Sequence, residues 1–306
     1  MSNFNQKTIN DKIELTGVGL HNGINVNLII KPGAPNTGIN FKRVDVAEDN
    51  IINANFKNVI EPILCTKLKN NSGVTVSTVE HLMAAFYGEG IDNALVEIDA
   101  AEIPIMDGSA IEFVDAIKSV GIKEQKDSRK FVRALKKVEV IDGKKSISIE
   151  PLSNDLIVDF EIVYSNPLIR TRRKEFKLSN DDLTNIYNSR TFCLFEDIEQ
   201  IKNQGLAKGG TLDNAIVVQG NRVLNDDGLR NRHEFVYHKI LDCLGDLMLS
   251  GHRIFGHIKT SQGGHALTNK LLMKFFSEQT NWTFETLKNK DETSEKSFKN
   301  TIAIGA

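Results

Sequence analysis

Residues 231–251, NRHEFVYHKILDCLGDLMLSG, have the pattern of a long amphipathic helix. Apolar side chains recur every three or four residues along one face, at Val236, Ile240, Cys243, Leu244 and Leu247. This spacing predicts a helix over about 231–249 that buries the apolar face. His238 and Asp242 are four residues apart, so they lie one turn apart on the opposite face. The helix is therefore expected to bury one side and to present an imidazole and a carboxylate on the other.

The two polar residues of this helix have the spacing of metal ligands. Donors one helical turn apart can converge on one ion, as His238 and Asp242 would. A hydrogen-bonded pair on a solvated surface would have the same spacing, and the chain contains no HExxH pattern that would favour the metal. The pair by itself leaves both interpretations open.

A second helix is expected over about 78–87, within STVEHLMAAFYGEG (77–90). Its apolar stripe consists of Val79, Leu82, Met83 and Phe86. At about 100° per residue, His81 lies opposite the centre of that stripe. The residues near it on that side are small: Ser77, Ala84, Ala85 and Gly88. We therefore expect another element or a ligand to approach this side of the helix closely.

Together the two helices offer the residues that a catalytic metal site would need. The set consists of two histidines and one carboxylate: His81, His238 and Asp242. Three protein ligands leave a fourth position on a zinc ion open for water, which is typical of catalytic rather than structural zinc. Glu80 is a further carboxylate next to this site, where a general base for that water is expected.

A general acid is also available in the second half of the chain. His265 is in the glycine-flanked loop SQGGHALTN (261–269). Asp246 is one turn beyond Asp242 and could hold the His265 imidazole in its protonated form. These residues favour a metal hydrolase, while ordinary core and surface roles for them remain the alternative.

The order of elements predicts an α+β fold rather than a doubly wound parallel sheet. Strands are expected at 12–15, 25–30 and 94–98 in the first half, and at 132–141, 145–149 and 156–164 in the second. Further helices are expected at 110–120, 181–188, 195–204 and 269–279. Strands followed by helices, twice over, indicate two similar domains, each a β-sheet layered on helices.

The expected domain junction is the segment GIKEQKDSRK, residues 121–130, which is polar and poor in apolar anchors. The first domain is accordingly residues 1–125 and the second is residues 126–285. Residues 286–306 also have few apolar anchors and are expected to form a mobile tail.

Composition excludes several classes of protein. The chain of 306 residues is long enough for two domains, and 38 basic against 40 acidic side chains give a formal net charge of -2. The densest basic run, residues 170–174, is typical of a solvated loop or strand edge, so no nucleic-acid partner is expected. Neither an apolar N-terminal segment nor a run of about 20 apolar residues is present, so no export or membrane span is expected. Three scattered cysteines suit a reducing compartment. We expect a cytoplasmic monomer.

Six stretches share their order and spacing with a known family: GVGLHNG (17–23), STVEHLMAA (77–85), GIDNALVEIDAAEIPIMDGSA (90–110), SRTFCLFEDIE (189–199), HKILDCLGD (238–246) and SQGGHALTNKLL (261–272). In these stretches the chain resembles the UDP-3-O-acyl-N-acetylglucosamine deacetylases, the LpxC proteins. The resemblance implies two domains of like topology with the active site in the cleft between them. It also implies an insert in each half, here at about 59–66 and 192–217.

The resemblance implies zinc-dependent hydrolysis of the N-acetyl group of a UDP-linked acylated amino sugar, with release of acetate, as a committed step of lipid A synthesis. The implied cofactor is Zn²⁺, with Fe²⁺ as an alternative in the cell. The implied metal ligands and catalytic residues are His81, His238 and Asp242, with Glu80 as general base, His265 as general acid paired with Asp246, and Thr191 as a hydrogen-bond donor to the oxyanion.

The resemblance implies a further set of substrate-binding residues: Lys239, Phe192, Lys145, Tyr164 and Gly264. Lys239 would contact the diphosphate, and Lys145 would be a second lysine on the phosphate side of the substrate. Phe192 would pack on the sugar, and Tyr164 would stack on uracil. Val163 and Asn166 depart from the family pattern, in which an acidic residue and a histidine are common.

An apolar passage for the O-linked acyl chain is expected in the second insert. Ile198, Ile201 and Leu206 would lie along a short amphipathic helix, followed by a glycine turn and a strand through Ala215 and Val217. The residues after the helix are small: Ala207, Gly209, Gly210 and Thr211. A packed core would have large side chains at these positions, so Ala207 and Ala215 are expected to line the passage. An ordinary surface flap is the alternative.

Two other functions remain compatible with the same residues. A non-haem iron oxygenase also uses two histidines and a carboxylate. A non-catalytic module that binds nucleotide sugars would have the same binding residues without turnover.

Overall fold

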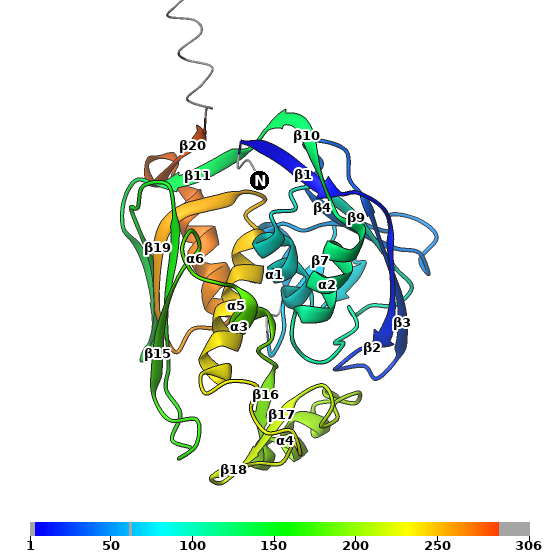
Figure 1. Ribbon diagram of the computed structural model, residues 1–306, viewed down its shortest axis with the longest axis vertical. Coiled ribbons are helices and arrows are strands. Elements are labelled where there is room, and N and C mark those ends of the chain that lie inside the picture. Colours follow the sequence, from blue (N-terminus) through cyan, green and yellow to red (C-terminus); the bar gives the residue numbers. More distant parts are fainter. Residues whose placement is uncertain (1–3, 61–62, 288–306) are drawn as a thin grey trace, which may run out of the picture.

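Two helices at the centre of the molecule bring its two halves together. The computed structural model describes residues 4–60 and 63–287 of the chain. α1 (Glu80–Glu89) lies beside α5 (Glu234–Met248), between two large sheets (Figure 1). α2 (Ile111–Val120) packs next to α1, and α6 (His265–Ser277) packs next to α5. The layers run sheet, helices, helices, sheet, which confirms the predicted α+β fold class.

The large sheet of the first half has the strand order β2–β3–β9–β4–β5. Its strands are β2 (Ile13–Val18), β3 (Asn25–Pro32), β9 (Ala94–Ile98), β4 (Ile39–Arg43) and β5 (Ile51–Asn53). All neighbours are antiparallel except β4 and β9. Val26, Leu28 and Ile30 are fully buried on one face of β3, because alternate residues of a strand point to the same side. The alternation thus turns one face of this sheet toward the core.

The large sheet of the second half is built around one long strand, β19 (Arg253–Ser261). The strands around it are β11 (Lys130–Ala134), β12 (Val138–Asp142), β13 (Lys145–Glu150), β14 (Leu156–Ile162), β15 (Arg172–Lys177) and β20 (Trp282–Thr286). β19 pairs with β13 in antiparallel fashion and with β14 and β11 in parallel. α6 packs on β12 and β13, so it covers the inner face of this sheet.

Smaller elements complete the fold. A three-stranded sheet in the first half contains β6 (Val59–Ile60), β7 (Lys67–Lys69) and β8 (Thr75–Ser77). A second three-stranded sheet contains β16 (Phe192–Leu194), β17 (Ile216–Gln219) and β18 (Arg222–Val223), and with α4 (Ile198–Asn203) it projects from one end of the molecule (Figure 1). We call residues 192–217 the second insert. The remaining pieces are α3 (Thr184–Tyr187) and the 3₁₀ turns Phe56–Asn58, Phe195–Asp197 and Gln279–Asn281.

The polar segment expected at the domain junction forms a strand. β10 (Ile122–Ser128) pairs with β1 (Asn5–Ile9) in antiparallel fashion. The division expected at residue 125 therefore falls inside β10, and the chain enters the second large sheet at Lys130. The division into two domains stays a prediction. Of the expected tail, residues 288–306 lie outside the described residues.

One expectation about strands is wrong, and the central strand of the second sheet was not among those expected. The run expected at 132–141 is two strands, because β11 pairs with β19 and β20 whereas β12 pairs with β13. Leu135, Lys136 and Lys137 are exposed where the chain passes between them. The central strand β19 was not expected at all, since Gly256 and the polar residues along it interrupt an apolar pattern. Strand pairing in the sheet decides both cases.

Two expectations about helices are also wrong. α6 begins at His265, so this histidine is the first helical residue rather than part of a loop. The short helix of the second insert ends at Asn203, so Leu206 lies beyond it. Ile198 and Ile201 are in α4, and both are only half-buried.

Small residues allow the two central helices to come close. A side-chain carbon at Gly245 of α5 would collide with the carbonyl oxygen of Glu80, and one at Gly88 of α1 would collide with the ring of Tyr187. The small side of α1 is therefore the side on which another element packs, as expected. His81 consequently faces α5.

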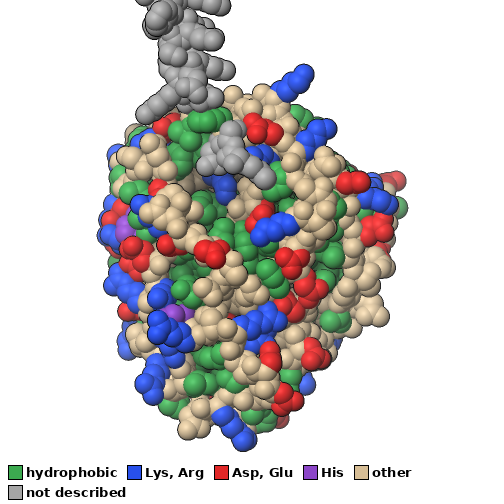
Figure 2. All heavy atoms as spheres, in the orientation of Figure 1, with side chains coloured by type: hydrophobic (Ala, Val, Ile, Leu, Met, Phe, Trp, Pro, Cys, Tyr) green, Lys and Arg blue, Asp and Glu red, His purple; other side chains and the backbone are tan. Residues whose placement is uncertain are grey.

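Charges of both signs are spread over the face of the molecule shown in Figure 2. Cys65, Cys193 and Cys243 are all free. Among the helices of the described residues, none combines the length and the apolar character that crossing a membrane requires.

Candidate active site

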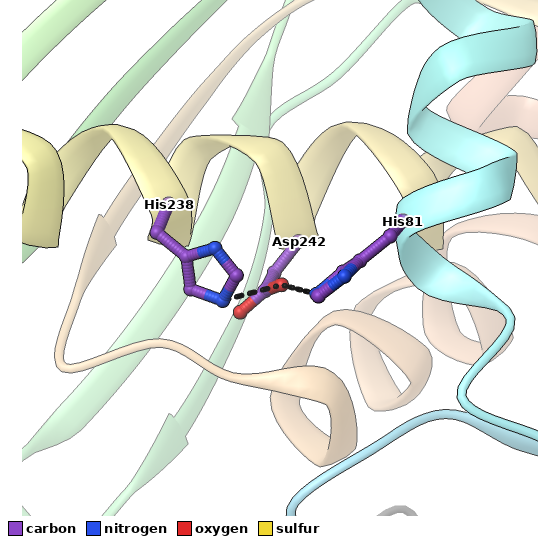
Figure 3. A group of neighbouring side chains, drawn as sticks. All are labelled: His81, His238 and Asp242. Carbon is purple, nitrogen blue, oxygen red and sulfur yellow. Dashed lines mark ion pairs between the residues drawn. The ribbon is translucent and has the colours of Figure 1, made fainter. Parts of the chain in front are cut away.

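The three expected metal ligands meet where α1 and α5 touch. His238 and Asp242 extend from α5 toward His81, which comes from α1 (Figure 3). Their donor atoms all lie within 4.8 Å of one another, and all three side chains are buried. Oδ1 of Asp242 is 3.4 Å from Nε2 of His238 and 3.6 Å from Nε2 of His81. Residues from the two halves of the chain therefore form one cluster.

A backbone contact orients the His238 ring. Its Nδ1 lies 3.0 Å from the carbonyl oxygen of Ser189, which can only accept, so Nδ1 carries the proton and Nε2 keeps a free lone pair. Burial, which outweighs the attraction of Asp242, lowers the pKa of His238 to about 3. His238 is thus a neutral imidazole at pH 7, as a metal ligand must be.

The cluster fits a divalent cation. Among the described residues, Oδ1 of Asp242 and Nδ1 of His81 are buried without a hydrogen-bond partner. A buried carboxylate oxygen without a partner is costly, and a metal ion among these three residues would satisfy it. Burial opposes ionisation of Asp242, but its interactions with His238 and Lys239 hold its pKa well below the usual value. Two imidazoles and an ionised carboxylate are a donor set suited to zinc.

Glu80 and His265 lie on one side of this cluster. Nε2 of His265 is 3.8 Å from Oε1 of Glu80 and 4.0 Å from Oδ2 of Asp242. Glu80 is fully buried and accepts a hydrogen bond of 3.0 Å from the backbone amide of Thr66. Burial raises the pKa of Glu80, against the attraction of His265 and His81. The geometry thus places a carboxylate of raised proton affinity next to an imidazole.

Asp246 holds the other nitrogen of His265. Nδ1 of His265 is 2.9 Å from Oδ2 of Asp246, and Oδ1 of Asp246 accepts a hydrogen bond of 2.5 Å from the Thr66 hydroxyl. Burial disfavours the imidazolium, but the charges of Asp246 and Glu80 outweigh it and raise the pKa of His265 to about 10. His265 is therefore protonated at neutral pH, with Nε2 turned toward the cluster.

A small polar cavity opens beside these side chains. Its volume is about 20 Å³, roughly the room of one water-sized particle. It is lined by Leu20, His21, Leu64, Thr78, Glu80, His81, Ile105, Thr191, His238, Lys239, Asp242 and His265. Thr191 lies on its edge, where its backbone amide donates to the carbonyl of Gly108 at 2.8 Å. Gly264 precedes α6, and a side-chain carbon there would meet nothing within 4 Å.

Three of the expected substrate-binding residues cluster at the other side of His238. The Phe192 ring is 5.7 Å from that of Tyr164 and 6.2 Å from that of His238. Nζ of Lys239 lies 5.7 Å above the Phe192 ring and 2.8 Å from Oδ2 of Asp242. Lys145 is not part of this group, because it is exposed at the start of β13. The carbonyl oxygen of the residue before it, Lys144, accepts a hydrogen bond of 3.5 Å from the Gln262 side chain.

A larger apolar cavity adjoins the polar one. It has a volume of about 380 Å³ and is lined mostly by the second insert, together with Thr191 and Leu224 next to the insert and Leu20, His21 and Leu64 from the first half. Ala207 and Ala215 both line it, as do Ile198 and Ile201. Leu20, His21, Leu64 and Thr191 line both cavities, so the two adjoin at these residues.

Several residues of the site were not expected from the sequence. Thr66 contacts both Glu80 and Asp246, and Ser189 orients His238 through its backbone. His21 lines both cavities. Thr66 acts through its hydroxyl and its backbone amide, and Ser189 acts through its backbone carbonyl. Every threonine and every peptide unit has these groups, so no sequence pattern could have predicted the two residues. His21 stands in the quoted stretch GVGLHNG, which was the available signal.

The family model described as UDP-3-O-acyl N-acetylglycosamine deacetylase, LpxC, matches residues 6–277. A UDP-3-O-acyl-N-acetylglucosamine deacetylase of Actinobacillus succinogenes is 44% identical over 290 residues, which are 94% of this chain and 95% of that protein. One of Aliivibrio fischeri is 43% identical over 291 residues, with 94% and 95% covered. One of Haemophilus influenzae is 44% identical over 290 residues, with the same coverage. Because the family model and these relatives match most of its length, the chain belongs to the LpxC family of UDP-3-O-acyl-N-acetylglucosamine deacetylases.

Proposed function

We propose that the chain hydrolyses the N-acetyl group of UDP-3-O-acyl-N-acetylglucosamine in a zinc-dependent reaction that releases acetate, the committed step of lipid A biosynthesis. The observation that carries the proposal is the meeting of His81, His238 and Asp242 in one buried cluster, with Glu80 and His265 beside it. The names of the relatives supply the substrate and the reaction. A cytoplasmic location and a monomeric state stay predictions.

The metal would be held by Nε2 of both histidines and by the Asp242 carboxylate. Zinc bound there supplies Lewis acidity to the acetamide carbonyl and to the attacking water. Fe²⁺ remains the alternative metal, because the same donors suit both ions. Lys239 lies beside this site, with its Nζ 2.8 Å from Oδ2 of Asp242.

Two proton transfers follow from the charges of the site. Glu80 takes the proton of the water that attacks the carbonyl carbon, because its burial raises its affinity for a proton. His265 gives the proton on Nε2 to the nitrogen of the leaving amine, since an amine leaves poorly without one. Asp246 keeps this imidazole protonated until that step. The products are acetate and a 2-amino sugar still linked to UDP.

The remaining contacts would stabilise and place the substrate. The Thr191 hydroxyl donates a hydrogen bond to the oxyanion, where charge develops in the transition state. Lys239 meets the diphosphate and Phe192 packs on the sugar, since both lie at the edge of the cluster. Tyr164 contacts the uracil, Gly264 leaves room for the substrate, and Lys145 meets the phosphate side.

The apolar cavity would bind the O-linked acyl chain. Ala207 and Ala215 leave its volume open, and the cavity adjoins the reaction centre at Thr191. Each buried methylene contributes about 0.8 kcal/mol, so a fatty chain there would dominate the affinity for substrate.

The two rival functions account for less of the site. An iron oxygenase would have no use for the general base Glu80 and the general acid His265 on one side of its metal. A binding module without turnover would not need an imidazole whose pKa is raised to about 10.

The test is acetate release from UDP-3-O-acyl-N-acetylglucosamine, with elemental analysis of the same purified protein. We expect about one zinc per chain, loss of turnover after chelation, and its return when zinc is added. Glu80→Gln should keep the metal and lose turnover, because it removes the base and not a ligand. Substrate binding without acetate release in the metal-loaded protein would refute the proposal.

A further inference from the structure

One loop of the first half, residues 19–24, forms part of the wall of both cavities. Leu20 and His21 line the polar cavity beside the metal ligands and also the apolar cavity in the second insert. The loop is a tight turn between β2 and β3, in which the backbone amide of Gly19 donates to the carbonyl of Ile24 and that of Gly23 donates to Gly19. Its position therefore affects both cavities at once.

The second insert rests on this loop through backbone hydrogen bonds. The amide of Gly209 donates to the carbonyl of Leu20 at 3.0 Å, and the amide of Lys208 donates to the carbonyl of His21 at 3.3 Å. The amide of Ala207 donates to Nδ1 of His21 at 3.4 Å. The wall of the apolar cavity near Ala207 is thus placed by the loop from the other half of the chain.

The carboxylate of Glu102 accepts hydrogen bonds from the backbone of this loop. Its side chain is buried, and its two oxygens accept from different backbone amides of the loop: Oε1 from His21 and Oε2 from Asn22, both at 2.8 Å. Oε1 also accepts from the Thr78 hydroxyl at 3.0 Å. A side-chain carbon at Gly19 would lie 2.8 Å from Oε2, so only glycine there lets the carboxylate approach this closely.

The Thr78 contact links the loop to the reaction centre. Thr78 is buried, lines the polar cavity and lies two residues before Glu80, the first residue of α1. One carboxylate thus joins the start of the helix that carries Glu80 and His81 to the wall of the apolar cavity. The distance between the start of α1 and the wall of the apolar cavity matters for the substrate. When its acyl chain lies in the apolar cavity, this distance determines where its amide group lies relative to Glu80 and His81.

We propose that Glu102 is a positioning residue for acyl-chain selection: by holding loop 19–24 against Thr78, it aligns the apolar cavity with the reaction centre. The proposal rests on the function proposed above. Glu102 touches neither the cluster of ligands nor the apolar cavity, so it acts through the loop. Its loss should therefore impair substrates with a long acyl chain more than substrates without one.

The variant Glu102→Gln tests this role with little change in shape. A glutamine amide has one accepting oxygen and one donating nitrogen. Since the two carboxylate oxygens accept from different backbone amides, either orientation of the glutamine sets its NH₂ group against one N–H of the loop. We expect the ratio of kcat/KM for the long-chain substrate to that for a 3-O-acetyl analogue to fall about tenfold, mainly through KM of the long-chain substrate, as for the loss of one buried hydrogen bond.

A matched control is Asp92→Asn. The Asp92 carboxylate also accepts from a backbone amide, that of Lys7 at 2.7 Å, but it pairs with Arg129 and lines neither cavity. The ratio should be unchanged in this variant, with normal zinc content in both. An unchanged ratio in Glu102→Gln, or an equal loss for both substrates, would overturn the role in chain selection.

Gly23→Ala is the second variant, in case Glu102→Gln is too unstable to assay. Gly23 is exposed with a φ of +71°, and a side-chain carbon there would lie 3.1 Å from Cβ of Lys208. The added methyl group disturbs the same loop from the surface. The ratio of kcat/KM for the long-chain substrate to that for the 3-O-acetyl analogue should therefore fall as well, and an unchanged ratio would count against the proposal. If the wild-type protein released no acetate from either substrate, the proposed function itself would be wrong.

Discussion

Burial disfavours charge on His238, Asp242 and His265 beside the polar cavity, yet neighbouring groups keep Asp242 and His265 charged. His265 stays protonated because Asp246 and Glu80 face it, and its pKa is raised to about 10. Asp242 stays ionised, and His238 stays neutral with a pKa of about 3. At neutral pH the site thus holds a protonated imidazole at His265 next to a neutral imidazole at His238 and an ionised carboxylate at Asp242.

The ligand assignment can be tested on single residues. His238→Ala and Asp242→Ala should each lose the metal together with turnover, because two donors cannot hold zinc as three do. The loss should exceed the roughly 10–100-fold cost of altering a group that only supports a ligand. His257→Ala is the control, since His257 belongs to a different group of possible ligands, with Asp159 and Glu175. Full metal occupancy in either ligand variant would show that the assignment is wrong.

The role of Asp246 appears in the dependence of rate on pH. Since the acid form of His265 is the proposed proton donor, kcat/KM should fall as the pH rises through its pKa. Asp246→Asn removes a charge that raises this pKa, so the alkaline limb should move to lower pH. A pH profile of kcat/KM for the two proteins measures the shift. An alkaline limb that stays in place in an active variant would contradict the pairing.

At the scale of elements, the contact between α1 and α5 brings the three candidate ligands together. Gly245→Ala should push the helices apart, because its side-chain carbon would collide with the carbonyl of Glu80. We expect a loss of about 1–3 kcal/mol in the free energy of unfolding, the usual cost of overpacking, and a lower zinc content because His81 moves away from α5. Denaturant unfolding and elemental analysis measure both.

Gly264→Ala is the control for this effect on stability, since a side-chain carbon there meets nothing within 4 Å. Its free energy of unfolding should stay within about 0.5 kcal/mol of wild type. Equal stability of the two variants would mean that the close approach of the helices does not depend on glycine.

At the scale of the whole molecule, the apolar cavity exists because the second insert docks on the first half. Its lining combines residues of the insert with Leu20, His21 and Leu64. Gly108 lies against the carbonyl of Asn214, so the insert approaches the first half closely there too. The proposed binding of the acyl chain would therefore depend on both halves together.

Filling this cavity should separate affinity from chemistry. Ala215→Trp places a large ring in a cavity of about 380 Å³, so KM for the long-chain substrate should rise by at least about tenfold, while the zinc content stays the same. Ala47→Trp, at an exposed turn, is the matched control and should leave KM unchanged. Equal KM values for the two variants, or equal turnover of a substrate that lacks the acyl chain, would place the chain elsewhere.

Local patterns were enough to predict the two central helices and what they carry. The period of apolar residues in 78–87 and 231–249 depends only on helical geometry, and so does the one-turn spacing of His238 and Asp242. β9 was predicted at its observed bounds, Ala94–Ile98, because its apolar residues are bounded by turn residues. The small residues around His81 indicated a close neighbour but not which one.

Contacts between distant residues settled the rest. β19 forms because β13, β14 and β11 pair with it, so its own sequence shows little of it. The partners that hold Glu80, His238 and Asp246 are Thr66 and Ser189, far from them in sequence and without a distinctive pattern. The convergence of His81 with His238 and Asp242 required the packing of α1 on α5. The sequence could name the candidate ligands because side-chain chemistry is local, whereas their distances depend on how two halves of the chain pack.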